Sequence, residues 1–172
     1  MAEYRESTHA RQWGIGWGPK MVRAVGHRRF AGPLRRLIVW IDRMLYRITG
    51  GRYLFAATVR IPTLALLVNT PQGSPLVVPL QYVVVDSNIY VLGTNWGRPR
   101  HPRWTRWLLD DGHCAVNIHG DQRTALARLV EGADRAAIWP RIIDVSEYYE
   151  RCQQISGRQL RIFQLTLNAA ES

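Results

Sequence analysis

The sequence predicts a mainly β fold of the α+β class, a six-stranded antiparallel barrel with peripheral helices. Six short β-rich runs are separated mostly by turn-length breaks, which is typical of antiparallel hairpins. One helix-like segment interrupts them after the third run, and a longer one precedes the sixth. With 172 residues, 47% hydrophobic and 21% charged, the chain can bury one core without a disulfide or metal.

Positive charge is concentrated in the N-terminal third of the chain. Residues 1–60 carry twelve Lys or Arg and three acids, a net +9, whereas the rest carries eleven Arg and ten acids, a net +1. Such asymmetry indicates contact with an anionic surface, either a membrane or a nucleic acid, although a merely solvated arm is an alternative. A nucleic-acid partner is not favoured, because the rest of the chain is nearly neutral and carries no recognisable motif.

Two regions follow from this composition: a flexible basic arm over residues 1–32 and a barrel domain over residues 33–172. The arm is glycine-rich and has no periodicity. Residues 33–49 form an amphipathic helix, with Pro33 at its first position and Gly50-Gly51 after its end. Its apolar stripe suits an anionic bilayer or the barrel itself, and consists of Leu34, Leu37, Ile38, Ile41, Leu45 and Ile48.

The remaining elements follow in order along the chain. Pro79 is expected at a bulge or an open edge of the second strand, since it has no N–H to donate. The third helical region contains one or two helices, with a break expected at Pro140. The strands cover residues 63–69, 76–85, 88–94, 113–118, 124–130 and 160–167, and the helices cover residues 101–111 and 131–154.

Two cysteines and the absence of an apolar leader or an 18-residue apolar span favour a reducing, cytoplasmic location. His113 and His119 share one face of their strand, whereas Cys114 lies on the other, so no metal site is expected. Asp110 and Asp111 are expected to be a solvated helix end without a role in acid–base chemistry.

Three segments of the barrel domain resemble one family. Residues 63–70 and 78–82 resemble its first hairpin, and Gly93-Thr94-Asn95-Trp96-Gly97 followed by Arg100-His101-Pro102-Arg103-Trp104 resembles its (Ser/Thr)-Asn-x-Gly loop and His-Pro-x-Trp helix start. Trp139, Tyr149, Gln153 and Arg158 match its C-terminal helix and the strand that follows. The family is the deazaflavin-dependent nitroreductases, of the FMN-binding-like split β-barrel superfamily, so a split barrel is expected.

The resemblance implies a site for coenzyme F420, a 5-deazaflavin hydride carrier with a phosphate and an oligoglutamate tail; FMN is the alternative cofactor. The implied reaction is hydride transfer from reduced F420 to an electrophilic, apolar acceptor, namely a nitro compound, a quinone or an activated alkene. The alternative function is a non-catalytic, membrane-associated barrel that binds a lipid or another apolar ligand. A homodimer and peripheral association of residues 1–50 with the inner face of the membrane are further expectations.

The resemblance also implies site residues. Tyr149 would orient the acceptor or supply a proton. Arg98, Arg100 and Arg103, with the Thr94–Gly97 backbone, would hold the anionic tail at a helix start. Trp96 would form a wall for the flat ring. His101 is expected to cap the helix and not to act as a base. The implied cofactor-binding set is Thr94, Asn95, Trp96, Gly97, Arg98, Arg100, His101, Trp104, Pro79 and Leu80.

The chain departs from the family at the first hairpin turn. A Gly-Arg-Lys-Ser-Gly turn, which grips the cofactor phosphate in the family, is replaced by Asn69-Thr70-Pro71-Gln72-Gly73-Ser74-Pro75. This turn has no cation, and its two prolines lack backbone donors. The family also spaces three tyrosines along its C-terminal helix, and only Tyr149 falls on that spacing here. The cations that hold the phosphate must therefore come from elsewhere in the chain.

Overall fold

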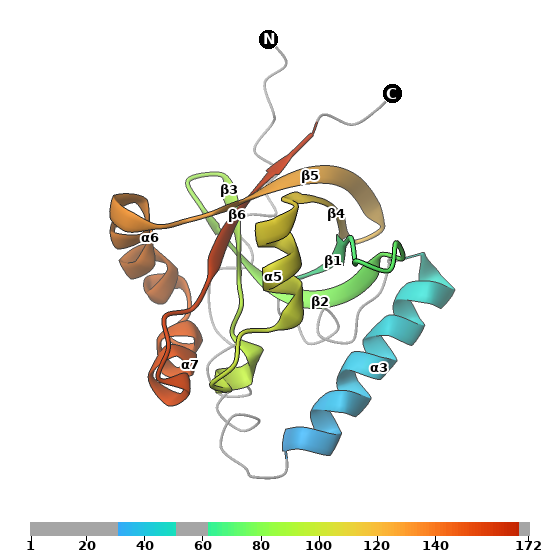
Figure 1. Ribbon diagram of the computed structural model, residues 1–172, viewed down its shortest axis with the longest axis horizontal. Coiled ribbons are helices and arrows are strands. Elements are labelled where there is room, and N and C mark those ends of the chain that lie inside the picture. Colours follow the sequence, from blue (N-terminus) through green and yellow to red (C-terminus); the bar gives the residue numbers. More distant parts are fainter. Residues whose placement is uncertain (1–30, 51–61, 169–172) are drawn as a thin grey trace.

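The computed structural model describes residues 31–50 and 62–168, so the predicted flexible arm lies outside the described residues except for Ala31 and Gly32, which are helical. Six strands close into an antiparallel barrel in the order β1-β2-β3-β6-β5-β4 (Figure 1). The predicted fold class is confirmed. The strands are β1 (Thr63–Val68), β2 (Leu76–Val85), β3 (Asn88–Leu92), β4 (His113–Ile118), β5 (Asp121–Leu129) and β6 (Ile162–Leu167).

The helices lie in the long connections. The 3-10 turn η1 (Asn95–Gly97) and helix α5 (Arg103–Asp110) join β3 to β4, as expected for a helix after the third strand. Helices α6 (Gly132–Val145) and α7 (Tyr148–Ser156) join β5 to β6. The break predicted at Pro140 is wrong: Pro140 lies inside α6, and the chain breaks at Ser146. Pro140 and Ala136 are both exposed, so water can satisfy the carbonyl that loses its partner.

Strand ends differ from prediction mainly at the β4–β5 hairpin. The turn is formed by His119 and Gly120, both with positive φ (55° and 94°), so β5 begins at Asp121, opposite Ile118. A two-residue turn with positive φ at both positions matches the twist of paired strands. The predicted strand began at residue 124, so Asp121 extends it by three residues.

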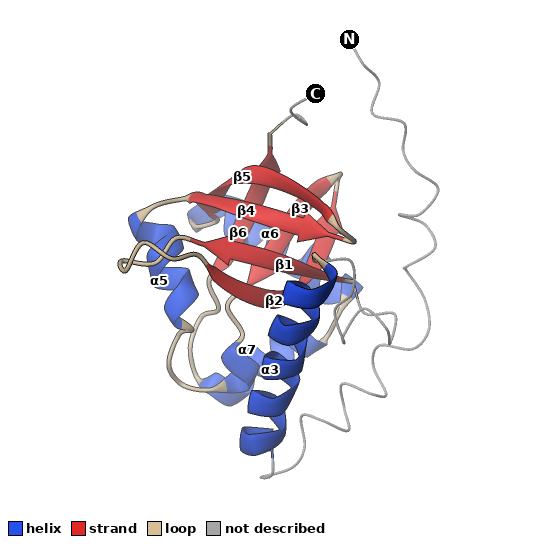
Figure 2. Cartoon of the chain, turned by 90° about the vertical axis from the view of Figure 1, so that its right-hand side faces the viewer, coloured by secondary structure: helices blue, strands red, loops and turns tan. Residues whose placement is uncertain are grey.

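The barrel interior is filled by alternate residues of the strands and closed at one end by α5. Cys114 and Val116 of β4 face inward and Ile118 packs against the same cluster, as their alternation predicted. Trp104 of α5 lies 5.9 Å from Phe163 of β6, ring centre to ring centre. Figure 2 shows α5 at one end of the barrel. A second apolar cluster lies outside the barrel wall, beneath α6 and α7.

Helix α3 (Ala31–Thr49) starts two residues before the predicted Pro33 and lies beside β2 (Figure 2). Arg43 Nε donates to the Val77 carbonyl of β2 at 3.2 Å, and the Tyr46 hydroxyl donates to Gln122 Oε1 at 2.9 Å. Part of the predicted stripe turns away from the barrel, because Leu37 and Ile48 are exposed. They share that face with two further apolar side chains, Trp40 and Met44. No helix in the described residues is long and apolar enough to span a membrane.

The first half of β2 has only one partner strand. Residues 76–81 pair with β1, whereas the pairing with β3 begins at Tyr82. The barrel is therefore split along the outer edge of residues 76–81. Pro79 lies in this half, which confirms the prediction of an open edge, since a missing N–H there costs no ladder hydrogen bond.

Candidate functional site

The segment after β3 has an unusual backbone. Asn95, Trp96 and Gly97 are three consecutive residues with φ of 45°, 58° and 72°, all in the left-handed region. For residues other than glycine this conformation costs roughly 1–2 kcal/mol each. A Cβ on Gly97 would lie 3.2 Å from Ile155 Cγ2 of α7, so glycine also allows the close packing there. Such strain persists only where the surroundings hold it, and it is concentrated at functional sites.

Side-chain hydrogen bonds hold this segment at both ends. Asn95 Nδ2 donates to the Arg100 carbonyl at 2.8 Å, which closes the loop on itself. Arg158, from the connection between α7 and β6, donates to the carbonyls of Gly93, Thr94 and Arg98 at 2.9, 2.9 and 3.1 Å. One side chain therefore holds the backbone of this segment, from a position 60 to 65 residues further along the chain.

The N–H groups of the same segment are largely used internally. Thr94 N donates to Leu92 O at 2.9 Å, Gly97 N to Thr94 O at 3.0 Å, and Arg98 N to Asn95 O at 3.2 Å. The N–H groups of Thr94 and Gly97 therefore already have carbonyl partners within the segment. This leaves the nearby side chains as the main donors for a phosphate at this loop.

His101 does not cap α5. Pro102 occupies the N-cap position without a side-chain hydrogen bond, and Thr105 Oγ1 donates to its carbonyl at 2.8 Å. His101 Nδ1 lies 3.0 Å from Arg158 Nη1, and since arginine can only donate, this ring nitrogen is an acceptor and the imidazole is neutral. Burial, followed by the charges of Arg158 and Arg161, lowers the pKa of His101 below its ordinary 6.5.

Exposed cations surround this loop. Residues 87–109 contain four arginines and no acid. Arg98, Arg100 and Arg103 are all exposed, and none of them forms an ion pair with the part of the chain that the structure describes. Trp96, two residues before Arg98 in the chain, has 42% of its surface exposed. The loop therefore presents a flat indole and three uncompensated positive charges to solvent.

The remaining implied cofactor contacts separate into two groups. Trp104 is only 6% exposed and belongs to the barrel core, so it closes the barrel instead of forming a wall of an open site. Leu80 packs against the same core, whereas Pro79 belongs to the unpaired edge of β2. Both residues are half-buried, and α3 contacts the same half of β2 through the hydrogen bond from Arg43 to Val77.

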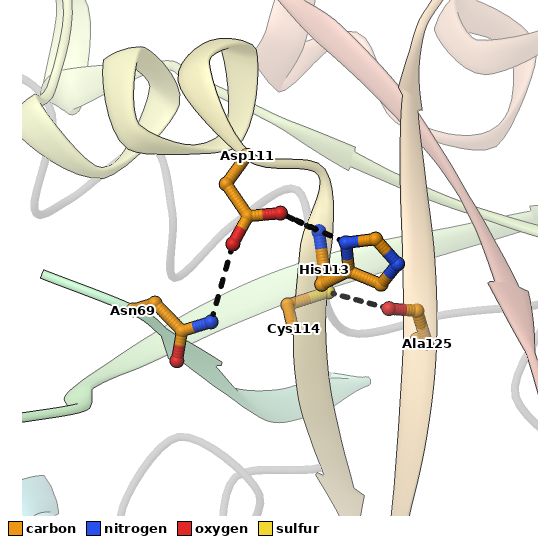
Figure 3. A network of polar contacts seen from close by, with 5 residues as sticks. All are labelled: Asn69, Asp111, His113, Cys114 and Ala125. Carbon is orange, nitrogen blue, oxygen red and sulfur yellow. Dashed lines mark hydrogen bonds and ion pairs between the residues drawn. The ribbon is translucent and has the colours of Figure 1, made fainter.

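The β1–β2 turn at the same end of the barrel is built differently (Figure 3). Asn69 Nδ2 donates to Asp111 Oδ2 at 3.4 Å, and Asp111 Oδ1 accepts from His113 N at 3.0 Å and lies 2.9 Å from His113 Nδ1. Donation from the His113 backbone, then from its ring and from Asn69, lowers the pKa of Asp111. Asp111 is exposed, as expected for a solvated helix end, but it also organises a polar network, and its negative charge makes this corner unsuited to a phosphate.

Cys114, beside this network, faces the barrel interior and is hydrogen-bonded to the Ala125 carbonyl at 3.5 Å (Figure 3). Burial raises the pKa of its thiol to about 11. His113 projects to the surface on the other face of β4. No cluster of three His, Cys, Asp or Glu suited to a metal occurs among the described residues.

Tyr149 lies in the cluster beneath α6 and α7 and is 3% exposed. Its ring meets Tyr148 edge-on, with 5.7 Å between ring centres. Burial, followed by the charge of and a hydrogen bond with Cys152, raises the pKa of Tyr148, and a hydrogen bond with Thr94 opposes this rise. Tyr148 is therefore linked directly to the loop. Sequence spacing missed this link, since Tyr148 is one position away from the tyrosine pattern of the family.

Trp139 and Gln153 also carried the C-terminal resemblance, and both contact Arg135 where α6, α7 and the start of β6 meet. Arg135, 9% exposed, lies over the Trp139 ring at 5.2 Å and donates to Gln153 Oε1 at 3.1 Å and to Leu160 O at 2.7 Å. Gln153 Oε1 also accepts from Leu160 N at 3.1 Å. These contacts fix the short connection that carries Arg158.

Comparison with known proteins identifies the family. The sequence profile of the F420H(2)-dependent quinone reductases matches residues 40–166. A Mycobacterium tuberculosis protein assigned by name to these quinone reductases is 28% identical over 103 residues, which is 59% of this chain and 87% of that protein.

Solved structures support the same fold. An F420-H2 dependent reductase superposes with a TM-score of 0.55 at 20% identity, over 61% of this chain and 94% of that chain. A structure described as a domain-swapped dimer superposes with a TM-score of 0.57 at 20% identity, over 78% of this chain and all of that chain. With the profile covering well over half of its length, this chain belongs to the F420H(2)-dependent quinone reductase family, a family of oxidoreductases that use coenzyme F420.

Proposed function

We propose that this chain transfers hydride from reduced F420 to a quinone, with nitro compounds and activated alkenes as further electrophilic acceptors. Family membership supports an F420-dependent oxidoreductase over both the non-catalytic lipid-binding barrel and the use of FMN. The quinone is the acceptor that the family name favours. The chemistry that F420 supplies when bound is carriage of a hydride as a two-electron unit.

One observation carries the proposal: Arg98, Arg100 and Arg103 are exposed, have no acidic partner among the described residues, and closely follow the exposed Trp96 in the chain. Several like charges on one short segment repel one another, so an anionic ligand would stabilise them. A phosphate with carboxylates provides such a ligand, and a flat ring can stack on Trp96. The residues of this loop therefore fit F420, although the β1–β2 turn does not.

In this proposal the protein supplies binding, orientation and exclusion of water. Arg98, Arg100 and Arg103 bind the anionic tail, Trp96 orients the ring, and Pro79 bounds the site along the open edge of β2. Holding the donor and acceptor in one geometry removes much of the entropic barrier to hydride transfer. No side chain needs to change its own oxidation state, and Cys114 is buried and protonated.

The test is a fluorescence titration of the purified protein with F420. The double change Arg98→Ala with Arg100→Ala should weaken binding at least tenfold, since each shielded charge-assisted contact contributes about 1.5–3 kcal/mol. The matched control is Arg123→Ala with Arg128→Ala, which removes the same charge from β5 and should leave the affinity near that of the wild type. Equal losses in both double variants would show a general charge effect, and no binding by the wild type would refute the proposal.

The proton and the orientation of the acceptor are assigned to the tyrosine pair. Tyr149 is the residue that the family spacing suggests, and Tyr148 is the one hydrogen-bonded to Thr94. If Tyr149 acts on the acceptor, Tyr149→Phe should slow quinone reduction without changing F420 affinity. Tyr148→Phe is the matched variant on the same helix turn. Normal turnover in Tyr149→Phe with slow turnover in Tyr148→Phe would transfer the role to Tyr148.

We also propose peripheral membrane contact through α3, as expected for residues 1–50. The supporting observation is the outward face of the helix, where Trp40 and Ile48 are 59% and 73% exposed beside the basic residues Arg36 and Arg47. Trp40→Glu should reduce co-sedimentation with anionic vesicles, whereas Val145→Glu on α6, also an exposed apolar residue, should not. Binding that is unaffected by Trp40→Glu and by deletion of residues 1–50 would exclude this contact.

A homodimer is proposed as the assembly, because one structural neighbour is described as a domain-swapped dimer. Light scattering after size exclusion should give twice the 19.8 kDa chain mass. A single monomeric species at micromolar concentration would contradict this proposal.

A further inference from the structure

We infer that Arg158 is the positioning residue of the proposed cofactor loop: it holds Asn95, Trp96 and Gly97 in their left-handed conformation and thereby sets where the Trp96 indole stands. This inference rests on the proposed function, since it assigns a role toward the F420 site. Arg158 would touch neither the cofactor nor the acceptor and would act through the loop.

The first argument is the set of atoms that one guanidinium reaches. Nη2 donates to the carbonyls of Gly93 and Thr94, which precede the left-handed residues, and Nε donates to the carbonyl of Arg98, which follows them. The side chain therefore ties both ends of the strained segment. Lysine is a single point donor on a flexible stem and cannot span this set, whereas the planar fork of arginine can.

The second argument is the strain itself. Local hydrogen bonds, namely Gly97 N to Thr94 O, Arg98 N to Asn95 O and Asn95 Nδ2 to Arg100 O, offset part of the strain. Contacts from outside the loop add to them, and Arg158 supplies three hydrogen bonds to its carbonyls and one to His101. Without Arg158 the segment is free to relax into ordinary φ values, and Trp96 would then leave its position.

The third argument is that Arg158 is itself held rigidly. Gly157, with φ of 64°, ends α7 and turns the chain toward β6. Leu160, two residues after Arg158, is fixed through both its N–H and its carbonyl by Gln153 and the buried Arg135. A side chain on a connection held in this way fixes the loop relative to α7, which packs directly against η1.

The experiment compares Arg158→Gln and Arg158→Lys with the wild type and with Arg151→Gln, an exposed arginine on α7 that serves as a charge control. Amide hydrogen exchange is followed in residues 94–101 and, in the same samples, in β1 and β4. F420 affinity is measured by fluorescence, and the KM for F420 is separated from the KM for a soluble naphthoquinone.

We expect exchange in residues 94–101 to be at least tenfold faster in Arg158→Gln, with the strands unchanged. F420 affinity should fall at least tenfold and the KM for the quinone should stay the same. Arg158→Lys should recover only part of both losses, and it replaces Arg158→Gln if that variant does not fold.

Two results would overturn the inference. One is loop exchange equal to that of the wild type in a folded Arg158 variant, which decides the matter whether or not F420 binds. The other is faster loop exchange with undiminished F420 affinity, which would separate the loop from the site. Failure of the wild type to bind F420 would instead overturn the proposed function.

Discussion

The loop after β3 and the turn between β1 and β2 differ in backbone strain and in charge. The segment from Gly93 to His101 is strained, tied by Arg158 and bordered by uncompensated arginines. The β1–β2 turn from Asn69 to Pro75 is exposed and neutral, and it is closed by two local bonds, Gly73 N to Thr70 O and Thr70 Oγ1 to Ser74 O. A third hydrogen bond, from Asn69 Nδ2, goes to the carboxylate of Asp111.

The difference suggests how anion binding can be redistributed within one fold. In the resembling family the turn carries the phosphate-binding cations, whereas here the positive charge borders the loop after β3. Under the proposed function, positive charge at the loop after β3, beside a neutral turn and the nearby Asp111, would favour the loop as the binding place of the anionic tail. The predictions below test whether rigidity and charge both lie in the loop.

The largest expected effect comes from substitution of Gly97, for which Gly73 is the matched control. Gly97 and Gly73 both have positive φ, 72° and 80°, but a Cβ meets Ile155 only at Gly97 and finds open space at Gly73. Gly97→Ala should therefore lower the free energy of unfolding by about 2–4 kcal/mol, and Gly73→Ala by about 1 kcal/mol. Urea denaturation of both variants measures the difference. Equal losses would mean that packing against α7 adds nothing to the loop.

Much of this architecture could be predicted because it depends on local patterns. The β-rich runs located all six strands to within a few residues, and the missing N–H of Pro79 indicated a bulge or an open edge, of which the structure has the edge. The site could be predicted only in part, because its decisive contacts are long-range. No pattern near Arg158 indicates that it meets Gly93, 65 residues away. His101 was expected to cap α5 because the bond to Arg158 is invisible in its neighbourhood, and Trp104 appeared in the site because a helix start does not reveal which face enters the barrel.

Restoring charge to the turn tests the redistribution directly. Pro71 and Gln72 are exposed at the tip of the turn. The double change Pro71→Arg with Gln72→Lys should strengthen F420 binding about tenfold, a gain of about 1.4 kcal/mol, and the gain should shrink as salt screens it. Pro71→Gln alone controls for the loss of the ring. An unchanged affinity at low salt would place the turn outside the path of the anionic tail.

Mild acid should affect the loop and not the turn. Folding lowers the pKa of His101 below 6.5, so the folded state binds fewer protons than the unfolded state, and stability falls as pH drops below about 6.5. Protonated Nδ1 loses its bond and faces Arg158 and Arg161. His101→Asn keeps an acceptor that does not titrate, so loop exchange between pH 7.5 and about 5.5 should change less than in the wild type. An identical pH profile in the variant would exclude His101 as the sensitive group.

The smallest effect is expected at the turn, and it sets in only at a lower pH than the effect of His101. Asp111 has a lowered pKa, so its network with Asn69 and His113 stabilises the fold above the ordinary value of 3.8 and is lost as pH falls below it. Asp111→Asn removes that titration while keeping an acceptor for His113 N. Thermal unfolding should show the variant slightly less stable than the wild type at pH 7, with the two converging below pH 3.8. Because the network is fully exposed, the gap at pH 7 should be smaller than for any loop variant above. A gap as large as that of Gly97→Ala would mean that the turn is held as firmly as the loop, and the contrast between them would fail.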